Sequence, residues 1–226
     1  NKVPFFMKIF ADKEEEWEIT IDNYESPIPE NLKWQNWAAD DEGLTGDALM
    51  EFVNNELFPA LKELDITISP QAQIIRSVFE DTYNYMKNGT LFRQVINVIN
   101  EIDFNSTTER HLFNDIYETI LKELQSAGSS GEYYTPRAVT QFMVDMIDPQ
   151  LGESILDPAC GTGGFLTCTI DHMREQVKTP KDRDVLQTSI RGIEKKPLPH
   201  LLCTTNLMLH GFDLPAVRRD NLLSKP

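Results

Sequence analysis

A nine-residue segment, Asp157-Pro-Ala-Cys-Gly-Thr-Gly-Gly-Phe165, constrains the fold of this chain more than any other part of its sequence. It follows Ser154-Ile-Leu156, which predicts a short strand, and it precedes an apolar pattern that predicts a helix from Phe165 to Met173. A strand, a glycine turn and a helix in this order are typical of the ligand-binding corner of a parallel α/β sheet. Glycines are needed there because a Cβ atom would block the close approach of the backbone to a bound nucleoside.

The spacing of the glycines excludes two common nucleotide sites. A dinucleotide-binding turn has the pattern G-x-G-x-x-G, whereas Gly161, Gly163 and Gly164 form G-x-G-G. A P-loop requires Gly-Lys followed by Ser or Thr, and this sequence does not follow the glycines. A purely structural turn stays open as an explanation for the glycines taken alone.

A second strand with an acidic end follows the glycine loop. Residues 190–193 predict this strand, which ends at Glu194, and Pro199 to Leu209 predict another helix, so the sequence indicates a parallel, doubly wound sheet. In nucleoside-binding folds of this class, an acidic side chain at that strand end binds the ribose hydroxyls. The interval of 37 residues from Asp157 exceeds the usual interval of about 20, and the polar stretch from Lys178 to Asp184 accounts for much of it.

The pair Asp220-Asn221 is open to three interpretations. It could cap a helix, form a turn or bind the edge of an adenine ring, and its spacing alone favours the turn. Two convincing strands are too few for a complete doubly wound sheet, so we expect the rest of the sheet to lie outside this sequence.

Residues 1–125 predict a helical domain. Three segments repeat apolar residues at intervals of mostly three or four, as the buried faces of helices do. The segments contain Leu49, Met50, Val53, Leu57, Leu61 and Leu64; Ile74, Ile75, Val78, Phe79 and Met86; and Leu112, Phe113, Ile116, Tyr117, Ile120, Leu121 and Leu124. Gly46-Asp47 predicts a cap for the first of these helices, and the acidic run from Asp12 to Glu18 is interpreted as solvated surface.

Residues 126–131, Ser-Ala-Gly-Ser-Ser-Gly, interrupt the helical pattern and predict a linker. Residues 132–226 are then expected to form the α/β domain. Its first helix is predicted at Tyr134-Thr-Pro136, with Thr135 as the N-cap and Pro136 in the first helical position. The apolar face of that helix would consist of Val139, Phe142, Met143 and Met146.

The net charge of the chain limits its contacts with nucleic acid. The chain has 36 acidic and 21 basic residues and so a net charge of −15. This charge repels DNA phosphates and does not support stand-alone DNA binding. If DNA is the substrate, a basic partner or another part of the protein must hold it. There is no apolar run of about 18 residues, so no membrane span is expected. Three cysteines, Cys160, Cys168 and Cys203, lack zinc-ligand spacing, so no metal site is expected, and they suit a reducing cytosol.

The sequence resembles the modification (methyltransferase) subunit of type I restriction-modification systems, a family of N-6 adenine-specific DNA methylases. Three strings carry the resemblance: Gly131-Glu-Tyr-Tyr-Thr-Pro-Arg137, the segment from Asp157 to Phe165, and Gly192-Ile-Glu194. Upstream, Trp34-Gln-Asn-Trp-Ala-Ala-Asp-Asp-Glu-Gly-Leu-Thr-Gly46 is similar to that family's helical N-terminal domain. The resemblance implies a mainly α N-terminal domain followed by a truncated, α/β Rossmann-like domain that depends on S-adenosylmethionine.

The resemblance also implies a cofactor pocket for S-adenosylmethionine. Its methionine end would be lined by Glu132, Tyr133, Tyr134, Thr135, Pro136 and Arg137. Thr162, Gly163 and Gly164 would pass beneath the cofactor. Asp157 would lie near the methionine amino group, Glu194 at the ribose and Asp220 by the adenine.

Members of this family methylate N6 of adenine in a bipartite DNA site, and they grip the base with Asn-Pro-Pro followed by Phe or Tyr. This sequence contains no Asn-Pro, so the catalytic motif is expected beyond residue 226 and no catalytic residue within this chain. The resemblance further implies a cytoplasmic complex with a second modification subunit, a specificity subunit that reads the DNA and a restriction subunit.

Other functions stay open at this point. The chain could belong to a methyltransferase that acts on protein or a small molecule. It could also be a non-catalytic interaction module that keeps a cofactor-like fold. A dehydrogenase is the least favoured option, because the glycine spacing differs from the dinucleotide pattern.

Overall fold

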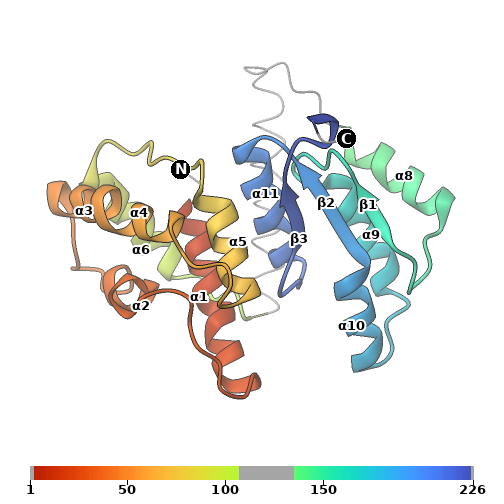
Figure 1. Ribbon diagram of the computed structural model, residues 1–226, viewed down its shortest axis with the longest axis horizontal. Helices are drawn as coiled ribbons and strands as arrows, with labels where there is room; N and C mark the ends of the chain where they lie inside the picture. The colour runs from red at the N-terminus through yellow and green to blue at the C-terminus, as the bar shows by residue number, and fades with distance from the viewer. Residues whose placement is uncertain (1–2, 107–134, 225–226) are drawn as a thin grey trace. The chain divides into compact units, whose positions relative to one another are not determined.

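The computed structural model describes residues 3–106 and 135–224 of the chain (Figure 1). The chain divides into two compact units, Asn1–Arg110 and His111–Pro226. The expected linker at residues 126–131 and the expected helix through Leu112 to Leu124 lie outside the described residues. The expected end of the helical domain at residue 125 therefore stays a prediction.

The described part of the first unit is helical. It consists of α1 (Val3–Thr20), the 3-10 turn η1 (Glu30–Leu32), α2 (Trp34–Trp37), α3 (Gly46–Phe52), the π-helical turn η2 (Val53–Leu57), α4 (Phe58–Lys62), α5 (Pro70–Phe79) and α6 (Gly89–Asn100). Aromatic rings fill its core. Phe79 lies at their centre, with Phe6 and Phe58 both packed edge-on against it.

Two of the expected helices of this unit are present with different limits. The helix expected from Asp47 is the run of α3, η2 and α4, but Thr45 rather than Gly46-Asp47 occupies its N-cap position. The helix expected from Ile74 to Met86 is α5, which ends at Phe79. The chain turns there, since the backbone N–H of Thr82 donates to the Phe79 carbonyl at 2.9 Å. Helices α1 and α6 were not expected.

The acidic run from Asp12 to Glu18 lies on α1, and its interpretation as solvated surface was wrong for Asp12 and Glu14. Only 6% of Asp12 and 3% of Glu14 is exposed. The Asp12 carboxylate accepts a hydrogen bond from the backbone N–H of Phe104 (2.9 Å), and the Glu14 carboxylate accepts one from the Tyr24 hydroxyl (2.9 Å). These partners offset the cost of removing the carboxylates from water, although burial still raises the pKa of Asp12.

The second unit contains a sheet of three parallel strands, β1 (Ile155–Asp157), β2 (Ile190–Glu194) and β3 (Ala216–Arg219), in the order β1-β2-β3. Its helices are α8 (Arg137–Ile147), α9 (Gly164–Arg174), α10 (Pro180–Ser189) and α11 (Pro197–Leu209), and η3 (Leu222–Ser224) is a 3-10 turn. Figure 1 shows the three strands side by side. No helix among residues 3–106 and 135–224 is long and apolar enough to cross a membrane.

The sequence predicted the elements around the glycine loop correctly. The strands that end at Asp157 and Glu194, and the helix that follows each of them, are confirmed. At Asp220-Asn221 the Asn221 side chain accepts a hydrogen bond from the Leu223 N–H at 3.2 Å, at the start of η3, so the pair precedes a 3-10 turn rather than forming a turn itself.

Two elements were missed, and one helix start was wrong. Helix α10 occupies most of the polar stretch from Lys178 to Asp184, and it begins with a capping box between Thr179 and Asp182. Strand β3 has only four residues, two of them arginine, and so lacks the apolar run that marks a strand. Helix α8 begins at Arg137 with Pro136 as its N-cap and no side-chain cap, so Thr135 does not have its predicted capping role.

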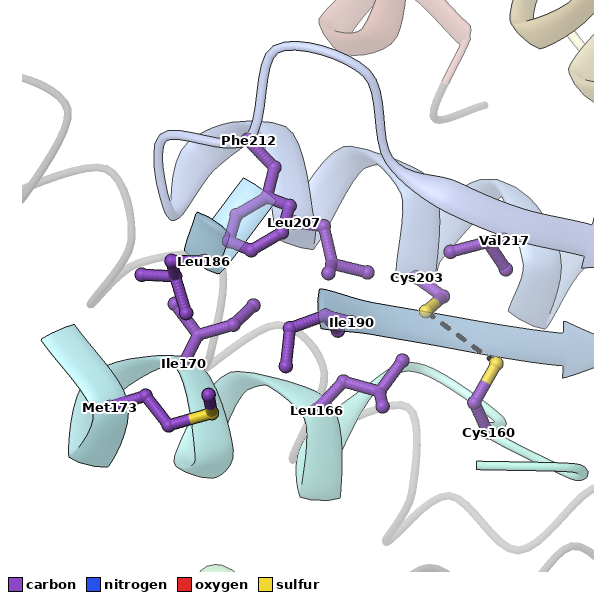
Figure 2. Close-up of a cluster of buried hydrophobic side chains, with 10 residues drawn as sticks. All are labelled: Cys160, Leu166, Ile170, Met173, Leu186, Ile190, Cys203, Leu207, Phe212 and Val217. Atoms are coloured by element: carbon purple, nitrogen blue, oxygen red, sulfur yellow. Dashed lines mark hydrogen bonds between the residues drawn. The ribbon is translucent and has the colours of Figure 1, made fainter. Parts of the chain in front are cut away.

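One face of the sheet is covered by helices. Ile190, Gly192 and Val217 are buried on this face, where β2 passes close to α9 and α11 in Figure 2. The core cluster consists of Cys160, Leu166, Ile170, Met173, Leu186, Ile190, Cys203, Leu207, Phe212 and Val217. On the other face, Leu156 and its register partner Arg191 are exposed. Within residues 135–224 the structure therefore contains one covered face of the expected doubly wound sheet.

The predicted apolar face of α8 is exposed to solvent. The exposed fraction of its side chains ranges from 42% for Met143 to 70% for Met146. It borders an apolar groove of about 280 Å³ between α8, β1 and α9. Leu156, Asp157 and Phe165 contribute to the lining of this groove. The groove thus adjoins the beginning of the glycine loop.

Candidate functional site

Three acidic residues lie at the same edge of the sheet. Asp157 ends β1, Glu194 ends β2 and Asp220 follows β3 directly. Since the strands are parallel and adjacent, their carboxyl ends meet at one edge. The backbone N–H of Asp220 donates to the Glu194 carbonyl at 3.1 Å, which holds these two residues side by side. The structure therefore brings together three residues that are far apart in the sequence.

The Glu194 carboxylate connects the glycine loop to the start of α11. One oxygen accepts a hydrogen bond from the backbone N–H of Gly161 (2.9 Å), and the other accepts one from the backbone N–H of Lys196 (2.7 Å). A carboxylate oxygen has two lone pairs, so both oxygens can also accept bonds from a ligand hydroxyl. Glu194 therefore orders the loop and presents an acceptor at the strand end.

Asp157 is half-buried beside the loop. Its carboxylate accepts a hydrogen bond from the Ala159 N–H at 3.1 Å. Burial is the largest cause of a raised pKa for Asp157, and the nearby charge of Glu194 raises this pKa further. A cationic ligand group would relieve both effects, because it would favour the ionised carboxylate. This edge of the sheet thus suits a ligand with positive charge.

The two glycines at the centre of the loop have different surroundings. Gly163 has a φ of +88°, and a Cβ atom on it would lie 2.9 Å from the Sγ of Cys203 on α11. Gly164 begins α9, and a Cβ atom on it would meet nothing within 4 Å. Gly163 is thus required by the fold, whereas Gly164 leaves open space above the backbone that a ligand could occupy.

Glycine is also required on β2, directly opposite the loop. A Cβ atom on Gly192 would lie 2.9 Å from the Sγ of Cys160. The sulfurs of Cys160 and Cys203 are themselves 3.7 Å apart beneath the loop (Figure 2). The cysteines are free and buried, so they act here as small core residues.

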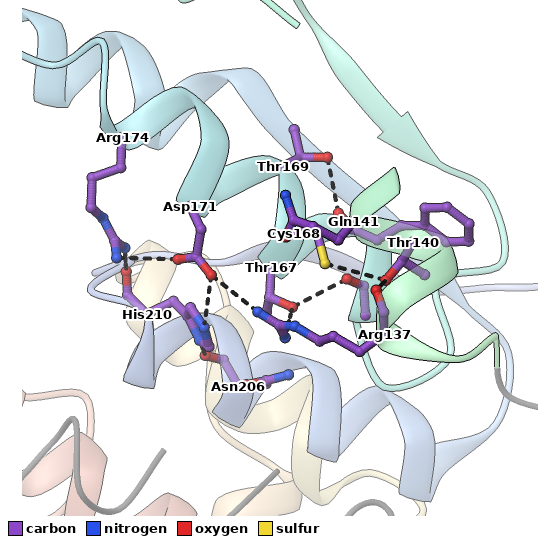
Figure 3. A network of polar contacts seen from close by, with 12 residues as sticks. Arg137, Thr140, Gln141, Thr167, Cys168, Thr169, Asp171, Arg174, Asn206 and His210 are labelled. Carbon is purple, nitrogen blue, oxygen red and sulfur yellow. Dashed lines mark hydrogen bonds and ion pairs between the residues drawn. The ribbon is translucent and has the colours of Figure 1, made fainter. Parts of the chain in front are cut away.

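A polar network supports the loop from α8, α9 and α11 (Figure 3). Buried Thr162 has its carbonyl bonded to the Asn206 side-chain amide at 3.2 Å. Arg137, at the start of α8, donates to the Thr167 hydroxyl (3.2 Å) and to the Asp171 carboxylate (3.1 Å). Asn206, Thr167 and Asp171 were not predicted from the sequence, although Thr167 and Asp171 are four residues apart and so share one face of α9.

The remaining predicted site residues fall into two groups. Glu132, Tyr133 and Tyr134 lie outside the described residues. Thr135 and Pro136 are exposed just before α8. In the described part of the chain, no group of three or more His, Cys, Asp or Glu side chains could hold a metal ion.

Comparisons with known proteins identify the family. A model described as N-6 DNA Methylase matches residues 108–226, and one described as HsdM N-terminal domain matches residues 5–99. The chain belongs to the N-6 DNA methylase family. It is 61% identical to the type I restriction enzyme EcoEI methylase subunit of Escherichia coli over 225 residues, which are 98% of this chain and 46% of that protein.

Solved structures show the same similarity. A modification subunit from Vibrio vulnificus YJ016, described as part of a type I restriction enzyme, matches 100% of this chain and 50% of its own length, at 41% identity and a TM-score of 0.81. A second structure, concerned with complex assembly and conformational transition of the type I R-M system, has a TM-score of 0.86 and 36% sequence identity to this chain. The match covers 98% of this chain and 45% of the chain in that structure. The chain therefore spans about half the length of these relatives.

We predict that Gly163→Ala lowers the free energy of unfolding by about 2–4 kcal/mol, because it adds a positive-φ penalty to a contact with Cys203. Gly164→Ala is the matched control, since its Cβ atom meets open space, and it should change this free energy by no more than about 1 kcal/mol. Urea denaturation of both variants measures the difference. Equal stability of the two would contradict the predicted packing.

We also predict that acid destabilises this unit through His200. His200 is fully buried, its Nε2 is 3.0 Å from the Val217 carbonyl, and no described residue bonds its Nδ1. Burial lowers the pKa of His200, so the unfolded state takes up the proton first as pH falls below about 6.5. The free energy of unfolding should therefore fall below that pH, by at most about 1.4 kcal/mol per pH unit for this group.

Denaturation at about pH 7.5 and about pH 5.5 tests this dependence. The His200→Gln variant should lose less stability between the two pH values than the wild type. Part of the loss should remain, because burial also lowers the pKa of His210. An unchanged loss in His200→Gln would refute the assignment.

Proposed function

We propose that this chain binds S-adenosylmethionine at the carboxyl edge of its sheet, and that the protein containing it methylates N6 of adenine in DNA. The convergence of Asp157, Glu194 and Asp220 around the glycine loop is the observation that carries the proposal. Family membership and the similarity to type I methylase subunits support it. The fold would then be the first part of a Rossmann-like methyltransferase domain.

The residues at the strand ends suit the three parts of this cofactor. The ionised Asp157 would pair with the methionine ammonium group. Glu194 would accept hydrogen bonds from the ribose hydroxyls, and Asp220 would accept one from the adenine amino group. Thr162, Gly163 and Gly164 would pass beneath the cofactor, where the open space above Gly164 provides room. Residues 132–137 would line the methionine end.

S-adenosylmethionine, when bound, supplies a sulfonium methyl group that is already a strong electrophile. This chain's contribution is therefore binding and orientation rather than acid–base chemistry. Glu194 holds the loop in place through its bond to the Gly161 N–H before a ligand binds. Binding would therefore lose less conformational entropy than it would with a disordered loop. We propose that the residues that grip the target adenine belong to a part of the protein outside residues 1–226.

DNA and other proteins would meet this chain in a larger assembly. We propose partners of three kinds: a specificity subunit, a restriction subunit and a second modification subunit, acting in the cytoplasm. With 36 acidic and 21 basic residues the chain repels phosphates. Of these, residues 1–110 hold 21 acidic residues and nine basic ones, so the helical unit is the more acidic part. The positive surface for DNA would then come mainly from a specificity subunit.

We predict that Gly164→Ala in the full-length protein weakens binding of S-adenosylmethionine by about tenfold or more, because the added methyl group occupies the ligand's space. Titration calorimetry measures the affinity, and thermal denaturation confirms that the variant keeps its stability. Wild-type affinity in a stable Gly164→Ala variant would place the cofactor elsewhere.

We further predict that the full-length protein methylates DNA only with its specificity subunit, because the acidic chain alone repels the substrate. Transfer of a radioactive methyl group to DNA measures the activity, and digestion of the product to nucleosides identifies N6-methyladenine. Residues 1–226 alone should transfer none. Methylation by this segment alone, or by the full-length protein without the specificity subunit, would contradict the proposal.

A further inference from the structure

The peptide group that joins Thr162 to Gly163 in the glycine loop is held at both of its ends. The Gly163 N–H donates to the Cys160 carbonyl at 2.8 Å, and the Thr162 carbonyl accepts a hydrogen bond from the side-chain amide of Asn206 at 3.2 Å. Asn206 lies on α11 (Figure 3) and is only 2% exposed. The plane of this peptide is therefore fixed from within the loop and from a helix that is distant in the sequence.

The two carbonyls that follow are held by α9 itself. This helix begins at Gly164, so its first backbone bond runs from the Thr167 N–H to the Gly163 carbonyl (2.8 Å). The Thr167 hydroxyl donates to the Gly164 carbonyl (3.2 Å). The Thr162 carbonyl lies one residue before the reach of these bonds. Its orientation therefore depends on the side chain of Asn206 rather than on the helix.

Gly163 gives this peptide a second possible orientation. Its φ is +88°, and glycine adopts positive and negative φ about equally well, so the backbone itself does not prevent a rotation of the peptide. In the rotated form the Thr162 oxygen would turn away from α11, toward the side on which Glu194 bonds Gly161. That oxygen would face the strand-end carboxylates instead of a donor, and it would take up space beneath the proposed cofactor.

We propose that Asn206 is a positioning residue for the cofactor. It selects the orientation of the Thr162–Gly163 peptide that leaves the ligand side of the loop free, and it does so without touching the ligand. The inference rests on the proposed function. A loop that spends part of its time in the rotated form binds more weakly, in proportion to the fraction that stays in the binding form. Asn206 thus acts on the affinity for the cofactor and not only on the stability of the fold.

The experiment measures binding of S-adenosylhomocysteine to the full-length protein by titration calorimetry. Thermal denaturation of each variant establishes that it is folded at the assay temperature. Asn206→Leu removes the donor at nearly the same volume and should weaken binding about tenfold, the size expected for one hydrogen bond. Thr205→Val is the matched control. The Thr205 hydroxyl is equally buried but bonds the Leu201 carbonyl within α11 (2.8 Å), so its removal should leave the affinity unchanged.

Asn206→Asp separates positioning from a general loss of stability. A protonated carboxyl group at this position can donate to the Thr162 carbonyl as the amide does, whereas an ionised one repels that oxygen. Burial raises the pKa of a carboxyl group, so the affinity of this variant should approach that of the wild type at about pH 6 and fall about tenfold below it at about pH 8.5. The ratio to the wild type at each pH removes the contributions of groups that both proteins share, such as His210 and Cys203 on α11 and Asp171 on α9.

These measurements distinguish the possible roles of Asn206. A folded Asn206→Leu variant with wild-type affinity, or an equal weakening by Thr205→Val, would overturn the positioning role and leave the proposed function intact. If Asn206→Leu does not fold, the Asn206→Asp comparison provides the test, and an affinity ratio that does not rise as the pH falls would overturn the role in the same way. If the wild-type protein does not bind S-adenosylhomocysteine, the proposed function fails, and this inference fails with it.

Discussion

The second unit depends on the close approach of three backbone segments, which only glycine permits. At Gly163 the loop lies against Cys203 of α11, and at Gly192 strand β2 lies against Cys160 of the loop. In both places a Cβ atom would lie 2.9 Å from a sulfur atom. These contacts set the height of the loop above the sheet, and so they determine where Asp157 and Glu194 lie relative to it.

Hydrogen bonds then fix the loop within that space. The Glu194 carboxylate bonds the N–H of Gly161, and Asn206 bonds the carbonyl of Thr162 from the opposite side. The loop is therefore ordered by side chains from β2 and α11 before a ligand binds. This preformed arrangement is consistent with the proposed role of these residues in binding and orientation rather than in proton transfer.

The sheet also leaves apolar surface exposed. Parallel sheets are usually covered on both faces, yet Leu156 is 58% exposed and the outer face of α8 is exposed beside it. The relatives matched by this chain are about twice as long. The described residues thus contain one covered face, on which the loop and its supporting network are built.

The sequence by itself determined the local elements of the site. The nine residues from Asp157 to Phe165 predicted a strand, a glycine turn and a helix, and the run that ends at Glu194 predicted the next strand, because these properties depend on neighbours in the chain. The family also followed from these strings. Strand β3 and helix α10 escaped prediction because both are short and polar, so that tertiary contacts rather than periodicity stabilise them.

Only the tertiary structure decided which side chains meet. Asp12 and Glu14 have the composition of a solvated surface, but their partners Phe104 and Tyr24 come from other parts of the fold and hold them in the core. The partners of the glycine loop, such as Asn206, likewise lie on helices distant in the sequence. Such pairings depend on packing between elements, and the periodicity of a single segment carries no information about them.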